Sequence, residues 1–303
     1  LAGEGETAGG LNQLIWQGVT QAQQAAGFDV TAQRVASAPA GGEHLPTLTA
    51  AGYDLIVAAA ETVTTADLRR FPQQTFVLVG ADAGLPHVLS LTFDLTQPAF
   101  LAGYLAAGVS ASGVVCTLAA EATAAHRATM AAFAAGVEQY NRQWEAEVLL
   151  LGWDGRGDQG AFVGSQDAAA LSVLVELLLG SGCDVLLPVG VADLRPTAAA
   201  VHARGRALIG GDVDGYLLAP EWGAAWLTSL QRHGDMMVLA AVQGLAAGQM
   251  HPGGVQVGTL ANGGVGLAPL HQWEERTPAA LRAELTLLQE ALVQGHLEIN
   301  PSP

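Results

Sequence analysis

The sequence contains no lysine. All 12 basic residues are arginines, and the 28 acidic residues set against them leave a formal net charge of −16 at pH 7. Because this excess of negative charge repels phosphate backbones and anionic lipid headgroups, we expect neither a nucleic acid nor a membrane surface as a partner. The absence of lysine also excludes a Walker-type phosphate loop, a Schiff base and a Ser–Lys catalytic pair.

Long hydrophobic runs and cysteines are scarce as well. No apolar run reaches the ~18 residues that a membrane-spanning helix needs, and no basic segment marks a signal peptide. Cys116 and Cys183 each lie within an apolar run. Because such runs form protein interiors, we expect two free, buried thiols that pack as small hydrophobic groups rather than a disulfide.

Apolar residues are abundant and follow an alternating pattern. Half of the 303 residues are hydrophobic and 13% are charged, which is enough material for two domains of ~150 residues each. Short apolar runs alternate with longer segments whose apolar residues recur at helical spacing. Strands are expected at 53–57, 75–79, 113–116, 148–151 and 184–187, and helices at 11–22 (capped at Gly27), 97–109, 123–142, 165–179, 234–247 and 277–293. The pattern predicts an α/β fold in which helices cover both faces of two parallel sheets.

Acidic side chains follow several of the apolar runs. In an open parallel sheet, ligands bind beyond the carboxyl ends of the strands. Glu61, Asp94, Asp154 and Asp212 each come directly after such a run. These carboxylates are therefore the first candidates for contact with a ligand.

Signatures of enzyme chemistry are missing from the sequence. The eight histidines show no zinc-binding spacing, and no Gly-x-Ser-x-Gly elbow occurs. Asp212 and Asp214 are candidates to hold a metal ion or to act as acid and base, but two acids after a strand more often cap a helix or accept a hydrogen bond from a hydroxyl. We expect no catalytic residue, no metal and no cofactor, and a site that holds a polar, hydroxylated small molecule without transforming it.

Several short motifs occur in an order that resembles the basic membrane protein family, the nucleoside-binding lipoproteins of ABC transporters. They cover nearly the whole chain: Gly10-Leu-Asn-Gln-x-x-Trp16-x-Gly18, Ser90-Leu-Thr-Phe93 with Phe100-Leu-Ala-Gly103, Phe133-Ala-Ala-Gly136, Leu208-Ile-Gly-Gly-Asp212, Pro252-Gly-Gly254 and Asn262-Gly-Gly-Val-Gly-Leu-Ala-Pro269. The resemblance implies a type I periplasmic-binding architecture, with two Rossmann-like lobes and three hinge crossings, near Asp94, Gln231 and Gly258. Residues 1–94 and 232–258 would form lobe one, residues 95–231 and 259–303 lobe two, and the ligand cleft would lie between them.

The resemblance also assigns roles to individual residues. Asn12 would meet the edge of a base, Gly190 would let the backbone approach a sugar, and Asp212 would accept hydrogen bonds from a pair of hydroxyls. These three positions, together with Glu61, are expected to bind the ligand.

Four further candidates mark departures from the family pattern. Leu11 stands where the family has a stacking Phe, Asp94 lies one place before the family acid, and Gln231 replaces a lysine. Trp153 would supply a replacement aromatic ring. The departures point to a ligand that differs from the usual one of the family.

The expected function is that of an extracytoplasmic substrate-binding protein that closes around a nucleoside or purine-like molecule and presents it to the permease of an ABC transporter. We expect a monomer whose precursor carries a lipid anchor. The alternatives are a Rossmann-like enzyme that processes nucleosides with Asp212 and Asp214, or a ligand sensor domain of the same fold.

Overall fold

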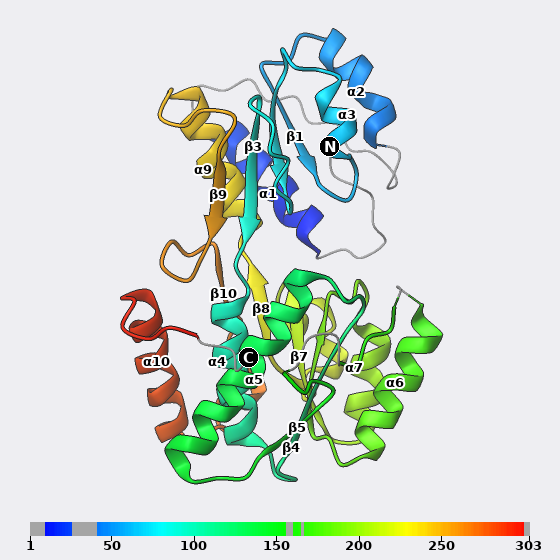
Figure 1. The fold of residues 1–303 in the computed structure, drawn as a ribbon, viewed down its shortest axis with the longest axis vertical. Coiled ribbons are helices and arrows are strands. Elements are labelled where there is room, and N and C mark those ends of the chain that lie inside the picture. The colour runs from blue at the N-terminus through cyan, green and yellow to red at the C-terminus, as the bar shows by residue number, and fades with distance from the viewer. Residues whose placement is uncertain (1–9, 26–40, 156–159, 165–166, 300–303) are drawn as a thin grey trace. The chain divides into compact units, whose positions relative to one another are not determined.

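The computed structural model describes residues 10–25, 41–155, 160–164 and 167–299. The cap expected at Gly27 lies outside these ranges. The chain divides into two compact units, which we call unit 1 (residues 1–94 and 232–264) and unit 2 (residues 95–231 and 265–303). Each unit is built on its own sheet of parallel strands with helices packed against it (Figure 1). The α/β fold with parallel sheets that the sequence predicts is confirmed.

The third boundary between the units falls after Gly264, rather than at Gly258 where the crossing was expected. Residues 259–264 fold back onto the end of the preceding strand, because Asn262 Nδ2 donates to the carbonyl of Val257 at 2.8 Å. Gly258 and Gly264 touch through their backbones: a Cβ on Gly264 would lie 2.3 Å from the Cα of Gly258. This turn is therefore part of unit 1.

The sheet of unit 1 is apolar on both faces. Its described strands are β1 (Leu55–Ala59), β2 (Thr75–Val79), β3 (Val88–Phe93) and β9 (Val255–Gly258), parallel and in the order β1-β2-β3-β9. Successive side chains of a strand point to opposite faces. Accordingly, Phe76 and Leu78 belong to one apolar cluster, and Val77 and Val79 belong to the other.

Helices cover the two faces of the unit 1 sheet. Helices α1 (Leu11–Gln24) and α9 (Gly234–Ala246) contribute to the cluster on one face, and α2 (Gly41–Ala50) and α3 (Thr65–Arg69) contribute to the cluster on the other. Helices α1 and α9 approach closely because Gly18 has no side chain; a Cβ there would lie 2.5 Å from the carbonyl oxygen of Asp235. This contact fixes the start of α1 at the carboxyl edge of the sheet.

The sheet of unit 2 is larger. Its described strands are β4 (Val114–Ala119), β5 (Leu149–Leu151), β6 (Val185–Val189), β7 (Ala207–Asp212), β8 (Trp226–Arg232) and β10 (Val265–Leu267), in the order β10-β8-β7-β6-β4-β5. Each pair of neighbouring strands from β8 to β5 in this order is parallel. The carboxyl ends of β6, β7 and β8 therefore lie side by side at one edge.

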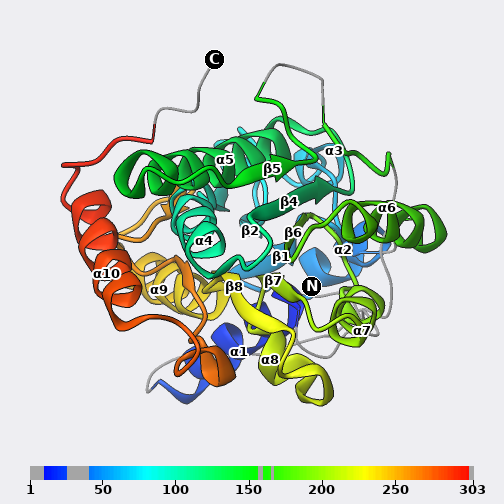
Figure 2. The same ribbon diagram turned by 90° about the horizontal axis from the view of Figure 1, so that it is seen from below.

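Two layers of helices enclose this second sheet. Helices α4 (Thr96–Val109), α5 (Ala124–Trp144) and α10 (Ala279–Val293) pack on one face, and α6 (Ala168–Gly180) and α7 (Arg195–Ala203) pack on the other (Figure 2). Helices α4 and α5 meet through two glycines: a Cβ on Gly103 would lie 2.0 Å from the carbonyl oxygen of Phe133, and one on Gly136 would lie 2.0 Å from that of Phe100. The two family-like motifs that contain these glycines thus serve helix packing.

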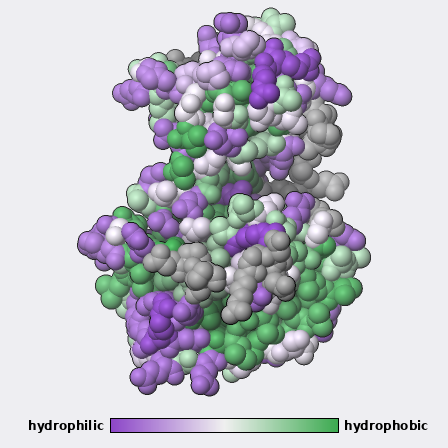
Figure 3. All heavy atoms as spheres, viewed as in Figure 1, coloured by the Kyte–Doolittle hydropathy of each residue, from purple (hydrophilic) through white to green (hydrophobic). Residues whose placement is uncertain are grey.

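Short helices and one exposed apolar face complete unit 2. Helix α8 (Gly215–Leu218) and the 3₁₀ turn η1 (Pro220–Trp222) follow β7, and the 3₁₀ turn η2 (His271–Trp273) follows β10. On α6, Val173 and Leu177 are 71% and 63% exposed. Figure 3 shows apolar residues gathered in green on the surface of unit 2. None of the helices in the described ranges combines the length and the apolar character needed to cross a bilayer.

The expectation of two free thiols is wrong. Cys116 in β4 and Cys183, just before β6, form a disulfide with a Cα–Cα separation of 5.9 Å, and both residues are fully buried. The two cysteines come together because β4 and β6 are neighbouring strands and both residues belong to the apolar cluster on the sheet face that α6 and α7 cover. The apolar surroundings correctly indicated burial, but pairing depended on a contact between positions 67 residues apart.

Candidate functional site

In unit 1, an amide and a carboxylate meet at the carboxyl edge of the sheet. Asn12 lies in the first turn of α1, and Glu61 lies in the turn after β1. The Nδ2 of Asn12 donates a hydrogen bond to Oε1 of Glu61. The Oδ1 of Asn12 is buried and has no hydrogen-bond partner among the described residues. Since buried polar atoms are normally paired, this oxygen marks a place where an additional donor would be accommodated.

Leu11, Gly234 and Phe93 form an apolar group beside this pair. A Cβ on Gly234, at the start of α9, would lie 2.9 Å from Cδ1 of Leu11 and 3.9 Å from the ring of Phe93. The guanidinium of Arg232 lies 5.9 Å from the centre of the Phe93 ring. Leu11 therefore packs onto α9. Phe93 contributes an aromatic ring and was not among the ligand-binding residues predicted from the sequence.

Asp94 follows β3 at the same edge of the unit 1 sheet. Its backbone N–H donates to the carbonyl of Gly258 at 2.9 Å, which extends the pairing of β3 with β9. The residue is half-buried. It stands two strands away from Glu61, because β2 lies between β1 and β3.

In unit 2, Gly190, Asp212 and Gln231 come from three neighbouring strands. Asp212 lies directly opposite Gln231 in the pairing of β7 with β8. Gly190 comes directly after β6, which is paired in parallel with β7. The structure therefore brings these three candidates into one row at the carboxyl edge.

The side chain of His126 fills the space beside Gly190. A Cβ on Gly190 would lie 2.3 Å from Cε1 of His126, and the residue has a left-handed φ of 68°. The imidazole is held because its Nδ1 lies 2.8 Å from the carbonyl of Glu121, which can only accept a hydrogen bond. Gly190 thus makes room for His126, in addition to the expected approach of its backbone to a ligand.

Trp153 belongs to the core of unit 2. The side chain is 8% exposed and meets the ring of Phe162 edge-on, with 6.2 Å between ring centres. It follows β5, at the end of the sheet order away from β7 and β8. A ring in this environment has little face left for stacking on a ligand, and its position supports a packing role.

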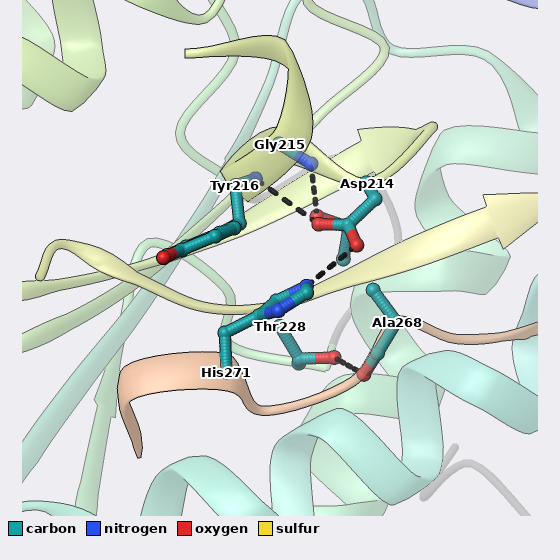
Figure 4. Close-up of polar contacts among 7 residues, drawn as sticks. Asp214, Gly215, Tyr216, Thr228, Ala268 and His271 are labelled. Atoms are coloured by element: carbon teal, nitrogen blue, oxygen red, sulfur yellow. Dashed lines mark hydrogen bonds and ion pairs between the residues drawn. The ribbon is translucent and has the colours of Figure 1, made fainter. Parts of the chain in front are cut away.

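Asp214 is tied to two other elements. Its Oδ1 accepts from the backbone N–H of Tyr216 at 3.1 Å and caps α8, and its Oδ2 lies 2.7 Å from Nε2 of His271. The rings of His271 and Tyr216 stack at 4.1 Å with 11° between their planes. Figure 4 shows the His271 ring reaching toward the Asp214 carboxylate. Both oxygens of Asp214 therefore have hydrogen-bond partners within unit 2.

The charged residues do not form a metal centre in the part of the chain that the structure describes. No group of three or more His, Cys, Asp or Glu side chains there is arranged to hold an ion. Burial and the hydrogen bond to Glu284 raise the pKa of Tyr104, but that residue packs between α4, α5 and α10, away from the strand ends.

Two histidines near the strand ends of unit 2 were not among the residues that the sequence predicted. His126 lies 64 positions from Gly190, and His271 lies 57 positions from Asp214, so neither pair forms a local motif. The acid after β7 pointed to the right edge of the sheet, but nothing in the sequence connected it to a residue beyond β10.

Comparison with models of protein families identifies the family to which the chain belongs. The family model Bmp, described as ABC transporter substrate-binding protein PnrA-like, matches residues 9–293. The chain belongs to the Bmp family. Members of this family are substrate-binding proteins of ABC transporters: they are extracytoplasmic, bind small-molecule ligands and work with membrane permeases. The resemblance inferred from the sequence motifs is confirmed.

Solved structures show the same fold as this Bmp-family chain. An ABC transporter solute-binding protein from Aeropyrum pernix K1 has a TM-score of 0.76 and 20% identity, covering 100% of this chain and 91% of that one. A solute-binding protein from Conexibacter woesei DSM 14684 has a TM-score of 0.73 and 20% identity, covering 99% and 97%. A transcriptional activator of the comK gene from Bacillus halodurans has a TM-score of 0.75, 20% identity and coverage of 95% and 96%. At such identity these likenesses concern the fold alone. Comparison with curated proteins gives no match.

Proposed function

We propose that this substrate-binding protein takes a nucleoside or a purine-like molecule as its ligand, closes around it with residues from both units, and presents it to the permease. Unit 1 would bind the base through Asn12 and Glu61, and unit 2 would bind the hydroxyl groups through Asp212. A ligand that contacts both units binds the closed form preferentially, which is what makes closure a signal to a permease.

The observation that carries the proposal is the pairing of Asn12 with Glu61. Glu61 fixes the orientation of the Asn12 amide, and Asn12 Oδ1 remains buried without a partner among the described residues. An oriented amide oxygen beside a carboxylate is complementary to the N–H donors on the edge of a nucleobase. Phe93 at the end of β3 offers an aromatic ring nearby.

The energies of these groups are sufficient for binding. A hydrogen bond to a desolvated carboxylate contributes about 1.5–3 kcal/mol, and an aromatic contact adds about 0.5–1.5 kcal/mol. A few such contacts together with apolar burial reach the roughly 8–12 kcal/mol that corresponds to micromolar to nanomolar affinity.

The disulfide between Cys116 and Cys183 supports function outside the cytoplasm. Disulfides persist in oxidising compartments and are rare where cellular thiols keep cysteines reduced. Since the pair cross-links two strands in the interior of unit 2, it is a structural feature of the folded protein. The monomeric state and the lipid anchor of the precursor rest on the family resemblance.

Isothermal titration against a panel of nucleosides and free bases tests the proposal. The protein is first unfolded, dialysed and refolded so that any co-purified ligand is removed. We expect micromolar or tighter binding of at least one member, weakened about tenfold by Asn12→Ala because one hydrogen bond to the base is lost. The matched control is Gln21→Ala, an exposed position on the same helix. Flat titrations for the whole panel would remove the nucleoside assignment.

A further inference from the structure

Two residues with left-handed backbones lie at the contact between Asp214 and His271: His271 itself, and Asp212, two positions before Asp214. Among the described residues, the only non-glycine positions with left-handed backbones are Glu145, Asp212 with φ of 65° and His271 with φ of 46°. Glu145 ends a helix, where this conformation is common. Asp212 and His271 instead lie on the two segments that the contact joins. Strained residues of this kind persist where their surroundings hold them, and they concentrate at ligand sites.

Strand β8 anchors the segment that follows β7. The N–H of Gly215 donates to Oγ of Ser229 at 3.0 Å. Gly215 also lies against Trp226, because a Cβ at this position would be 2.5 Å from the indole ring. Just before it, the N–H of Val213 donates to the carbonyl of Gly211 at 2.8 Å, which folds the chain tightly around Asp212.

The segment that carries His271 is anchored to the same strand. Oγ1 of Thr228 donates to the carbonyl of Ala268 at 2.7 Å, and the N–H of Ala268 donates to the carbonyl of Ser229 at 2.9 Å. Figure 4 shows the bond between Thr228 and Ala268 beneath the Asp214–His271 contact. The contact therefore closes a ring of interactions that runs from β8 through both segments.

We propose that Asp214, His271 and Tyr216, which we call the clamp, position Asp212 for the ligand. The inference rests on the proposed function, in which Asp212 accepts hydrogen bonds from the ligand's hydroxyls. Only Val213 separates Asp212 from Asp214, so a fixed Asp214 limits the conformations open to the strained residue before it. With the clamp intact, the carboxylate of Asp212 stays at the strand end, opposite Gln231. Without it, the turn is free to relax toward an ordinary backbone conformation, which redirects the carboxylate.

The test compares His271→Ala, His271→Gln and, as a matched control, His296→Ala at an exposed position of the same unit. Ligand affinity is measured by titration with the panel member that the wild-type protein binds, and amide hydrogen exchange is followed at residues 212–216. We expect His271→Ala to weaken binding about tenfold and to accelerate exchange at these amides, because the group that fixes the turn is lost. His271→Gln, which still carries an N–H donor for Asp214, should restore most of the affinity, and His296→Ala should change neither measurement.

The two measurements separate the clamp from a merely structural role and from the proposed function. A lowered melting temperature with unchanged affinity in His271→Ala would assign the clamp to stability alone and overturn the inference. If the wild-type protein binds no member of the panel, the proposed function fails. The hydrogen-exchange data then test whether His271 fixes the turn at residues 212–216. Unchanged exchange at residues 212–216 in His271→Ala would then overturn the clamp as well.

Discussion

Individual residues near the strand ends differ in what holds them in place. Asp212 is held by its backbone: it lies in a left-handed turn, and its neighbours are bonded to β8 and to η2. Trp153 is held by its side chain, which is buried against Phe162 in the core of unit 2. Substitution of the first is therefore expected to affect binding, and substitution of the second to affect folding.

Asp212→Asn is expected to lower the affinity for the ligand by about 2–3 kcal/mol, because hydrogen bonds to a charged group are lost. Asparagine tolerates the left-handed conformation well, so the melting temperature should change little. Titration calorimetry and thermal unfolding of the same samples check both points. Affinity equal to that of the wild-type protein would place the hydroxyl site elsewhere.

Trp153→Ala is expected to reduce the free energy of unfolding by about 3–5 kcal/mol, because it leaves a large cavity in the core. Leu149→Ala serves as the control, since Leu149 lies on the preceding strand and is 61% exposed. Denaturant unfolding provides the measurement. A stable Trp153→Ala protein with weakened ligand binding would instead support the stacking role inferred from the sequence.

Residues of the candidate site could be predicted only where a local pattern revealed them. Asp212 and Glu61 follow apolar runs, and the structure places both at the carboxyl ends of strands. The contact between Asp214 and His271 joins positions that are 57 residues apart in the sequence. The contact between Gly190 and His126 is likewise long-range. Such contacts arise from strand order, which a single sequence does not encode locally.

At the scale of secondary-structure elements, the contact of α4 with α5 depends on the absence of two side chains. Gly103→Ala is expected to cost about 1–3 kcal/mol of stability, because the new methyl group would overlap the carbonyl oxygen of Phe133. Gly180→Ala at the end of α6 is the matched control, since nothing lies within 4 Å of a Cβ there. That control should leave stability unchanged or raise it by up to about 1 kcal/mol. Equal unfolding midpoints for the two variants would contradict the close helix contact.

Elements with strong periodicity were predicted well. The helix expected at 97–109 is α4 (Thr96–Val109), and that expected at 277–293 is α10 (Ala279–Val293). The strand expected at 75–79 is β2, apolar on both faces. Strand β9 was missed because residues 255–257 are exposed at the edge of the sheet and include Gln256, so the apolar signal of a buried strand is absent.

At the scale of the whole molecule, the disulfide is the main covalent constraint on unit 2. It closes a loop between residues 67 positions apart, and a loop of this length corresponds to about 4 kcal/mol of stabilisation. We expect wild-type protein that is unfolded and refolded in the presence of a thiol reductant to have a lower unfolding midpoint than the oxidised protein. The double variant Cys116→Ala/Cys183→Ala should have this lower unfolding midpoint without any reductant. The double variant should not respond to reductant. Identical midpoints for wild-type and variant protein would show that the cross-link adds no stability.

Each unit is assembled from two separate stretches of the chain, since residues 232–264 return to unit 1 and residues 265–303 return to unit 2. No single cut in the chain can therefore release either half intact. During synthesis, unit 2 acquires β10 and α10 only when residues 265–293 have left the ribosome, after unit 1 has received β9. A minimal binding fragment for biosensor work would have to be built by joining distant stretches with new linkers, not by truncation.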